Sequence, residues 1–216
     1  MNITKNQLLH GSLIAAISHA IMTNIYPELA YEQSWDGNNY LALDSQGLRG
    51  IITFLPNYCV GAIRNENNPQ CELIRTEDLL INFPKEIAAV AREETLQYML
   101  VQKNGTIEPA ATSMFWADMS TLHFDQSNRN IPVESCEDMQ LFYKNTLSPE
   151  AAFDAWKKYY DMPEAALMLA KRLTMKKRLS LSTQIFLSKK EKSMIPGDSI
   201  CEECEASMHE LNIVIG

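Results

Sequence analysis

Residues 31–64, YEQSWDGNNYLALDSQGLRGIITFLPNYCVGAIR, decide the fold that the sequence predicts. Two turn-forming clusters, DGNN from position 36 and DSQG from position 44, separate short apolar runs. These runs span residues 40–43, 48–54 and 58–63, and the last two are rich in β-branched side chains. Because connections this short cannot make a parallel crossover, the runs predict an antiparallel β-meander.

The segments on both sides of the meander have helical patterns. Between residues 7 and 24, apolar side chains at positions 9, 13, 17 and 21 recur every four residues and form one stripe. Pro84 opens a second segment, expected to be helical to about residue 102. Ser148-Pro149-Glu150 is a strong helix start, and the similar run at 161–164 begins another helix. These last two helices are expected to form a hairpin.

The remaining segments give further expectations. Residues 72–74 and 111–124 are interpreted as strands, residues 125–131 as a loop, and residues 134–145 and 179–192 as helices. Residues 211–215 predict a last strand that returns to the central sheet. The sequence therefore indicates an α+β fold with a central antiparallel meander of about 4–6 strands covered by helices. Residues 1–146 would form the sheet-bearing region and residues 147–216 a helical C-terminal region, packed together as one domain.

Charge is unevenly distributed along the chain. The net charge is −8, but residues 171–192 hold eight basic side chains and one acidic one. The other residues hold 11 basic and 26 acidic side chains, which favours a basic protein as partner and argues against general affinity for nucleic acid or anionic membranes. The basic segment is the exception: it is typical of a solvated helix face, and the alternatives are contact with phosphate or RNA, or with an acidic surface such as that of a second copy in a homo-oligomer.

The compartment is inferred from the cysteines and the apolar runs. Five cysteines is an odd number, and a chain of 216 residues can bury a sizeable core without disulfides. The sequence has no run of about 18 apolar residues, so it predicts no membrane-spanning helix. The N-terminal apolar segment is interrupted by Ser18 and His19 and has no small-residue cleavage site, so a structural helix is expected there. Together these features predict a cytoplasmic protein.

Cys201-Glu202-Glu203-Cys204, followed by His209, has the spacing of a metal site. Two thiolates two residues apart can share a tetrahedral zinc ion, with His209 as a third ligand. A fourth ligand is not apparent nearby, and the adjacent glutamates disfavour the reactive thiolate that a redox pair needs. The sequence thus leaves open a zinc-binding module at Cys201, Cys204 and His209, against the alternative of no cofactor.

One catalytic group can be suggested. His123 and Asp125 would share a face of a strand, and Asp118 is close by, so the three could act as an acid–base group in a hydrolase. No nucleophile stands at a recognisable spacing from them. His10 and His19 lie nine residues apart on one predicted helix and therefore point in opposite directions.

The turn within residues 35–40 is a candidate binding loop. Trp35 and Tyr40 bracket Asp36, Asn38 and Asn39, and aromatic side chains around an Asn/Asp turn suit recognition. The glycines match no phosphate-binding or dinucleotide-binding motif.

Taken together, the acidic composition and the lack of a recognisable catalytic set favour a non-catalytic protein-binding module. In size, acidity and α+β plan the chain is similar to many small bacterial proteins that bind and neutralise toxins, an analogy of type that includes no motif. We therefore expect an immunity-like inhibitor of a basic partner, with the hydrolase and the metal-binding module as alternatives.

Overall fold

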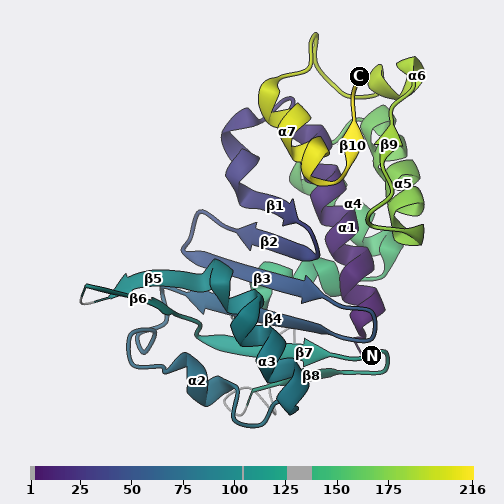
Figure 1. Cartoon of the computed structure of the whole chain (residues 1–216). Helices are drawn as coiled ribbons and strands as arrows, with labels where there is room; N and C mark the ends of the chain where they lie inside the picture. The colour runs from purple at the N-terminus through teal and green to yellow at the C-terminus, as the bar shows by residue number, and fades with distance from the viewer. Residues whose placement is uncertain (1–2, 104, 126–137) are drawn as a thin grey trace. The chain divides into compact units, whose positions relative to one another are not determined.

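The computed structural model describes residues 3–103, 105–125 and 138–216 and confirms an α+β fold. Within these residues, six strands form one antiparallel sheet in the order β1-β2-β3-β4-β7-β8 (Figure 1). The strands are β1 Gln33–Asp36, β2 Asn39–Leu43, β3 Leu48–Phe54, β4 Cys59–Asn65, β7 Ser113–Ala117 and β8 Leu122–Phe124. The predicted meander is thus present as β2, β3 and β4, and the expected strand-rich segment supplies β7 and β8.

The chain folds into two compact units. The first consists of Met1–Asn6 and Leu41–Tyr143, and the second of Gln7–Tyr40 and Lys144–Gly216. The sequence-based border at residue 146 is close to Lys144, where the chain enters the second unit for the second time. The first helix, which the sequence groups with the sheet, belongs to the second unit.

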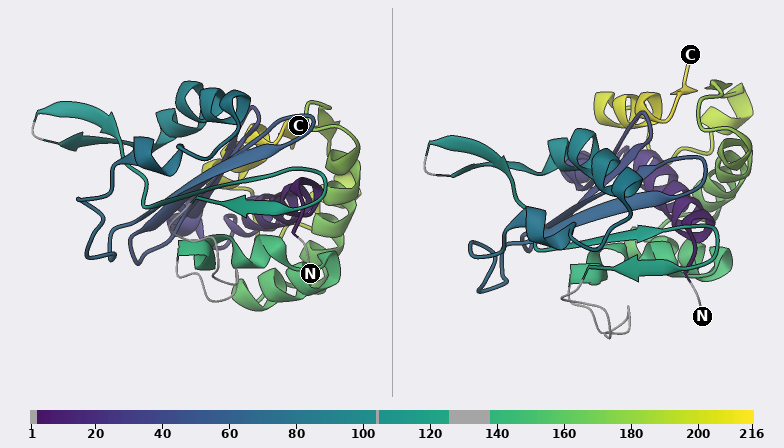
Figure 2. Two further views of the ribbon diagram at one scale, coloured as in Figure 1. Left: turned by 90° about the horizontal axis from the view of Figure 1, so that it is seen from below. Right: turned by 60° about the horizontal axis from the view of Figure 1, so that its bottom comes forward.

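In the first unit, β3 and β4 pair along seven residues, from Leu48↔Asn65 to Phe54↔Cys59. One face of this pair carries a buried apolar cluster contributed by the sheet and by α3 Lys85–Glu93, which Figure 2 shows lying across the strands. Between β4 and β7, Gly61 leaves space for the Phe115 ring, since a Cβ atom at Gly61 would lie 2.2 Å from it.

The helix predicted for residues 84–102 is shorter than expected. It ends at Glu93, the 3-10 helix η2 covers Thr95–Met99, and β5 Leu100–Lys103 then pairs with β6 Thr106–Pro109. The break coincides with Thr95, which is fully buried and has its Oγ1 2.8 Å from that of Thr53. A β-branched side chain held by a tertiary hydrogen bond outweighs the helical pattern here. The strand predicted for 72–74 is also wrong, because these residues form turns ahead of the short helix α2 Thr76–Leu79.

The second unit is built mainly from helices. They are α1 Lys5–Met22, η1 Pro27–Glu32, α4 Pro149–Tyr159, α5 Glu164–Leu179, α6 Lys189–Lys192 and α7 Glu202–Glu210. Ser148 caps α4 as predicted, since its Oγ accepts a hydrogen bond from the Ala151 amide at 3.3 Å. Gly11 permits close packing of α1, because a Cβ atom there would lie 2.0 Å from the carbonyl oxygen of Asn145.

The C-terminal expectations need two corrections. Residues 179–192 are not one helix: α5 ends at Leu179, strand β9 Ile185–Phe186 follows, and a capping box at Ser188 starts α6. The last strand, β10 Ile213–Val214, pairs in parallel with β9 and does not join the central sheet.

The helix predicted for residues 134–145 is described only in part. Its described residues belong to the 3-10 helix η5 Asp138–Thr146. Residues 134–137 and most of the loop predicted for residues 125–131 lie outside the described residues.

No helix in the described part of the chain is both long and apolar enough to span a membrane.

Candidate functional site

The aromatic residues of the candidate loop at 35–40 are buried. Trp35 donates its indole N–H to the Gly37 carbonyl at 2.9 Å, and its ring lies 5.8 Å from that of Tyr40. Asn39 is also buried, so the exposed part of this hairpin is the turn of Asp36, Gly37 and Asn38. The two aromatic side chains therefore stabilise the second unit and do not present a recognition surface in this conformation.

The structure separates the three residues of the proposed acid–base group by environment. His123 stacks on Trp116 with ring centroids 3.8 Å apart, and its Nε2 lies 3.8 Å from Asp118 Oδ2. Asp118 is a turn residue whose Oδ1 accepts hydrogen bonds from Ser120 and from the amide of Thr121; these bonds lower its pKa to about 2.

Asp125 has a different role from His123. Its side chain is fully buried, and its Oδ2 accepts a hydrogen bond of 2.7 Å from the amide of Met114 in the neighbouring strand. A carboxylate that binds a backbone amide in this way fixes the end of the sheet. The geometry thus brings His123 and Asp118 together at the β7–β8 turn and places Asp125 in the core.

The cysteine motif lies at the start of α7. Cys201 precedes the helix and its amide donates to Asn24 Oδ1 at 2.7 Å, whereas Cys204 is fully buried. Burial raises the pKa of the Cys204 thiol to about 12, and His209 points to solvent near the other end of the helix. In the described residues no three His, Cys, Asp or Glu side chains come together as metal ligands.

In the second unit, the basic segment is organised around its single acidic residue. Glu191 is buried, and its Oε1 lies 3.1 Å from both Arg172 Nε and Lys176 Nζ. Hydrogen bonds from Ser188 lower its pKa to about 2. Lys177 is buried as well and donates to the carbonyls of the following loop, so three of the eight basic side chains of this segment make structural contacts.

Sequence reasoning missed a buried polar network in the second unit. The Tyr160 hydroxyl lies 2.8 Å from His19 Nδ1, and Gln33 donates to the same hydroxyl at 3.4 Å. Gln33 in turn accepts from the Tyr40 hydroxyl at 2.9 Å. His19 Nε2 lies 3.4 Å from the Ala30 carbonyl, an acceptor, so Nε2 carries the proton and Nδ1 accepts from Tyr160.

Beside this network lies a charged aromatic group. Glu32 is buried and accepts hydrogen bonds of 2.9 and 3.0 Å from the Tyr159 hydroxyl. Lys144 Nζ lies 4.5 Å from the Trp156 ring and 4.3 Å from the Tyr159 ring, a cation–π arrangement. The hollow next to His19 measures about 10 Å³, room for about one water molecule, so no substrate fits there and the network stabilises the unit.

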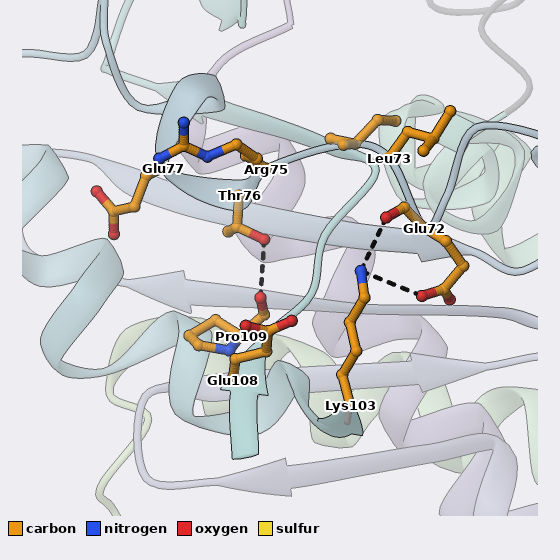
Figure 3. Close-up of a pocket in the computed structure, with 9 residues that line it drawn as sticks. Glu72, Leu73, Arg75, Thr76, Glu77, Lys103, Glu108 and Pro109 are labelled. Atoms are coloured by element: carbon orange, nitrogen blue, oxygen red, sulfur yellow. Dashed lines mark hydrogen bonds and ion pairs between the residues drawn. The ribbon is translucent and has the colours of Figure 1, made fainter. Parts of the chain in front are cut away.

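A larger hollow lies beside the β5–β6 hairpin of the first unit, and we call it the hairpin hollow. Its volume is about 280 Å³, and it is lined by Glu72, Leu73, Ile74, Arg75, Thr76, Glu77, Lys103, Glu108 and Pro109. Figure 3 shows Lys103 reaching across to Glu72: its Nζ donates to the Glu72 carbonyl at 2.8 Å and lies 3.3 Å from Oε2. Thr76 Oγ1 donates to the Pro109 carbonyl at 2.9 Å. These contacts hold the loop against the hairpin.

Most carboxylates of the hairpin hollow already have cationic partners. Glu72 pairs with Arg64 at 2.8 Å, and hydrogen bonds from Arg64 and Lys103 lower its pKa. Glu77 is bound by Arg92, also at 2.8 Å. Glu108 is exposed and forms no ion pair with any residue that the structure describes. It is therefore the carboxylate of this hollow that is available to a ligand.

The outer edge of β6 is open at Ile107, whereas the Pro109 carbonyl on the same edge already accepts from Thr76. Met99 and Ala110 form a hydrogen-bonded pair, because the Ala110 amide donates to the Met99 carbonyl. Hydrogen-bonded and non-hydrogen-bonded pairs alternate along an antiparallel ladder, so the pair Gln102–Ile107, three steps further along, is not hydrogen-bonded. The N–H and C=O of Ile107 therefore point away from β5. No other described strand pairs with β6, and the Ile107 side chain is 73% exposed. Figure 2 shows the hairpin extending from the rest of the first unit.

An edge strand that combines unpaired backbone groups with an exposed apolar side chain is a template for another strand. Sequence reasoning did not find this hairpin, although Asn104-Gly105 between alternating residues is a strong signal for one.

Comparison of the chain with protein-family models, with curated proteins and with solved structures found no match.

Proposed function

We propose that this chain is a non-catalytic protein-binding module whose first unit takes an extended, basic segment of a partner as an added strand along β6. The open edge at Ile107 is the observation that carries the proposal, because backbone hydrogen bonds to an unpaired strand supply affinity without any pre-formed pocket. Neutralisation of a basic toxin, the role that the composition favours, would use a contact of this kind.

The side chains of β6 define the pattern of the partner segment. Successive residues of a strand point to opposite faces, so Ile107 and Glu108 face different sides of the hairpin. A paired strand would place an apolar side chain beside Ile107 and a Lys or Arg beside Glu108 and the hairpin hollow. The preferred segment therefore alternates apolar and basic residues.

Long-range charge supports the same class of partner. The first unit holds 8 basic and 14 acidic side chains, so it attracts a cationic segment before contact. The main effects expected are faster association and discrimination against acidic segments. Raising the salt concentration should slow the association.

The proposal can be tested with synthetic peptides. The probe is a fluorescent eight-residue peptide of alternating Lys and Val, titrated with the full chain and followed by anisotropy; a Glu-Val peptide is the charge control. Ile107→Pro removes the outward N–H, which the hairpin itself does not use, and should weaken binding by about tenfold or more. Gln102→Pro makes the same change on the β5 edge and should leave binding unchanged.

Two results would refute the proposal. If the parent chain bound the Glu-Val peptide as well as the Lys-Val peptide, the charge argument would be wrong. If Ile107→Pro and the parent bound the Lys-Val peptide equally, while circular dichroism showed that both were folded, the added-strand contact would be wrong.

A further inference from the structure

Helix α5 of the second unit carries an exposed apolar stripe. Met168, Met175 and Leu179 are 57%, 72% and 88% exposed. They are separated by seven and four residues, which is about two turns and about one turn of an α-helix, so they lie in one line along its outer face. An apolar line on an otherwise polar helix face is expected where another surface packs.

Cations flank the stripe on both sides. At about 100° per residue, Lys171 and Arg178 fall on one side of it and Arg172 and Lys176 on the other. The contacts with Glu191 hold the second pair in place. The face is therefore apolar along its centre and carries cations along both borders, and Glu191 offsets part of the charge of Arg172 and Lys176.

A hollow opens next to the stripe, and we call it the α5 hollow. Its volume is about 320 Å³, and it is lined by His10, Pro149, Glu150, Phe153, Asp154, Lys171, Thr174 and Met175. Met175 belongs to both the stripe and the hollow, and the flanking Lys171 also lines the hollow. Thr174 is buried, and its Oγ1 has no hydrogen-bond partner among the described residues. The size and apolar lining of the hollow suit one bulky aromatic side chain.

We propose that the outer face of α5 binds an acidic amphipathic helix of a partner protein, which inserts one aromatic side chain into the α5 hollow. The stripe packs against the apolar side of the partner helix, and the carboxylates of the partner helix pair with the cations that flank the stripe. Exposed methionines suit such a contact because their flexible side chains adapt to the partner. A lipid surface would match the charge, but it has no use for a hollow of side-chain size. This surface lies in the other unit from β6 and has the opposite charge, so the inference is independent of the proposed function.

The probe is a designed helical peptide with a Leu stripe, one central Trp and flanking Glu residues. Fluorescence anisotropy with the full chain should show saturable binding, and a peptide with the same composition but without the stripe should bind at least about tenfold more weakly. Met175→Asp should weaken binding by at least about tenfold, whereas Met119→Asp, at an exposed methionine of the first unit, should leave it unchanged.

Each other outcome overturns the proposal. Equal binding of the two peptides would mean that charge alone acts. Binding to vesicles of phosphatidylcholine and phosphatidylglycerol, without peptide binding, would assign the face to a membrane. A concentration-dependent dimer in sedimentation that Met175→Asp dissociates would assign it to a second copy of the chain.

Discussion

Protonation of His19 should destabilise the second unit at mildly acidic pH. This histidine is fully buried and neutral, since it accepts from Tyr160 through Nδ1 and donates to the Ala30 carbonyl through Nε2. A second proton on the ring would turn the acceptor at Nδ1 into a donor and would place a charge in the core. Burial therefore lowers the pKa of His19 from 6.5 to about 4.

The size of the effect follows from this shift. As the pH falls below 6.5, the unfolded chain takes up the proton and the folded chain does not, so the free energy of unfolding decreases until the pH reaches about 4. The decrease is about 1.4 kcal/mol per pH unit, or about 3 kcal/mol in total. Above pH 6.5 His19 makes no pH-dependent contribution.

Urea unfolding at a series of pH values tests this prediction. Tryptophan fluorescence is a suitable signal, because two of the three tryptophans, Trp35 and Trp156, belong to the second unit. His19→Gln keeps a polar side chain but cannot ionise, so it should remove about 2–3 kcal/mol of the decrease seen between about pH 6.5 and pH 4.5. The exposed His209→Gln is the matched control and should behave like the parent. Identical pH dependence in the His19 variant and the parent would refute the reasoning.

Three further predictions concern other buried groups. Glu191→Gln should lower the free energy of unfolding by about 1–3 kcal/mol, because it weakens two ion pairs and a capping box; an unchanged thermal midpoint would contradict this. Gly61→Ala should destabilise by about 1–3 kcal/mol, because its Cβ atom would overlap the Phe115 ring, and a neutral result in urea unfolding would show that the ring moves freely. Iodoacetamide should modify the partly exposed Cys71 much faster than Cys204, whose thiol pKa burial raises to about 12; similar rates by peptide mass spectrometry would count against the buried position of Cys204.

The parts of the fold predicted best from sequence are those with strong local signals. The turn clusters at 36–39 and 44–47 separate β1, β2 and β3, and Ser148 caps α4. Residues 179–192 carry no local signal for strand β9, because β9 is only two residues long and pairs with β10, which lies far away in the sequence. Pairing between segments far apart in the chain is a tertiary effect that local patterns do not contain.

The candidate sites show the same limit. Local spacing correctly placed His123 near Asp118, but it gave no sign that Asp125 binds the Met114 amide. The link between His19 and Tyr160 joins residues 141 positions apart, so no motif predicts it. The β5–β6 hairpin is different, because a local signal for it exists: the sequence has an Asn-Gly pair at positions 104–105. The hairpin was missed because the helix predicted from residue 84 was extended to residue 102, over the residues of β5.

Amide hydrogen exchange of the first unit, with and without the Lys-Val peptide, tests the added strand most directly. Exchange at Ile107 should be fast in the free chain, since its N–H faces the open edge of β6, and it should become slow on peptide binding. Protection at Gln102 should stay unchanged, because that amide lies on the opposite edge. Peptide binding that leaves Ile107 exchange unchanged would contradict the account.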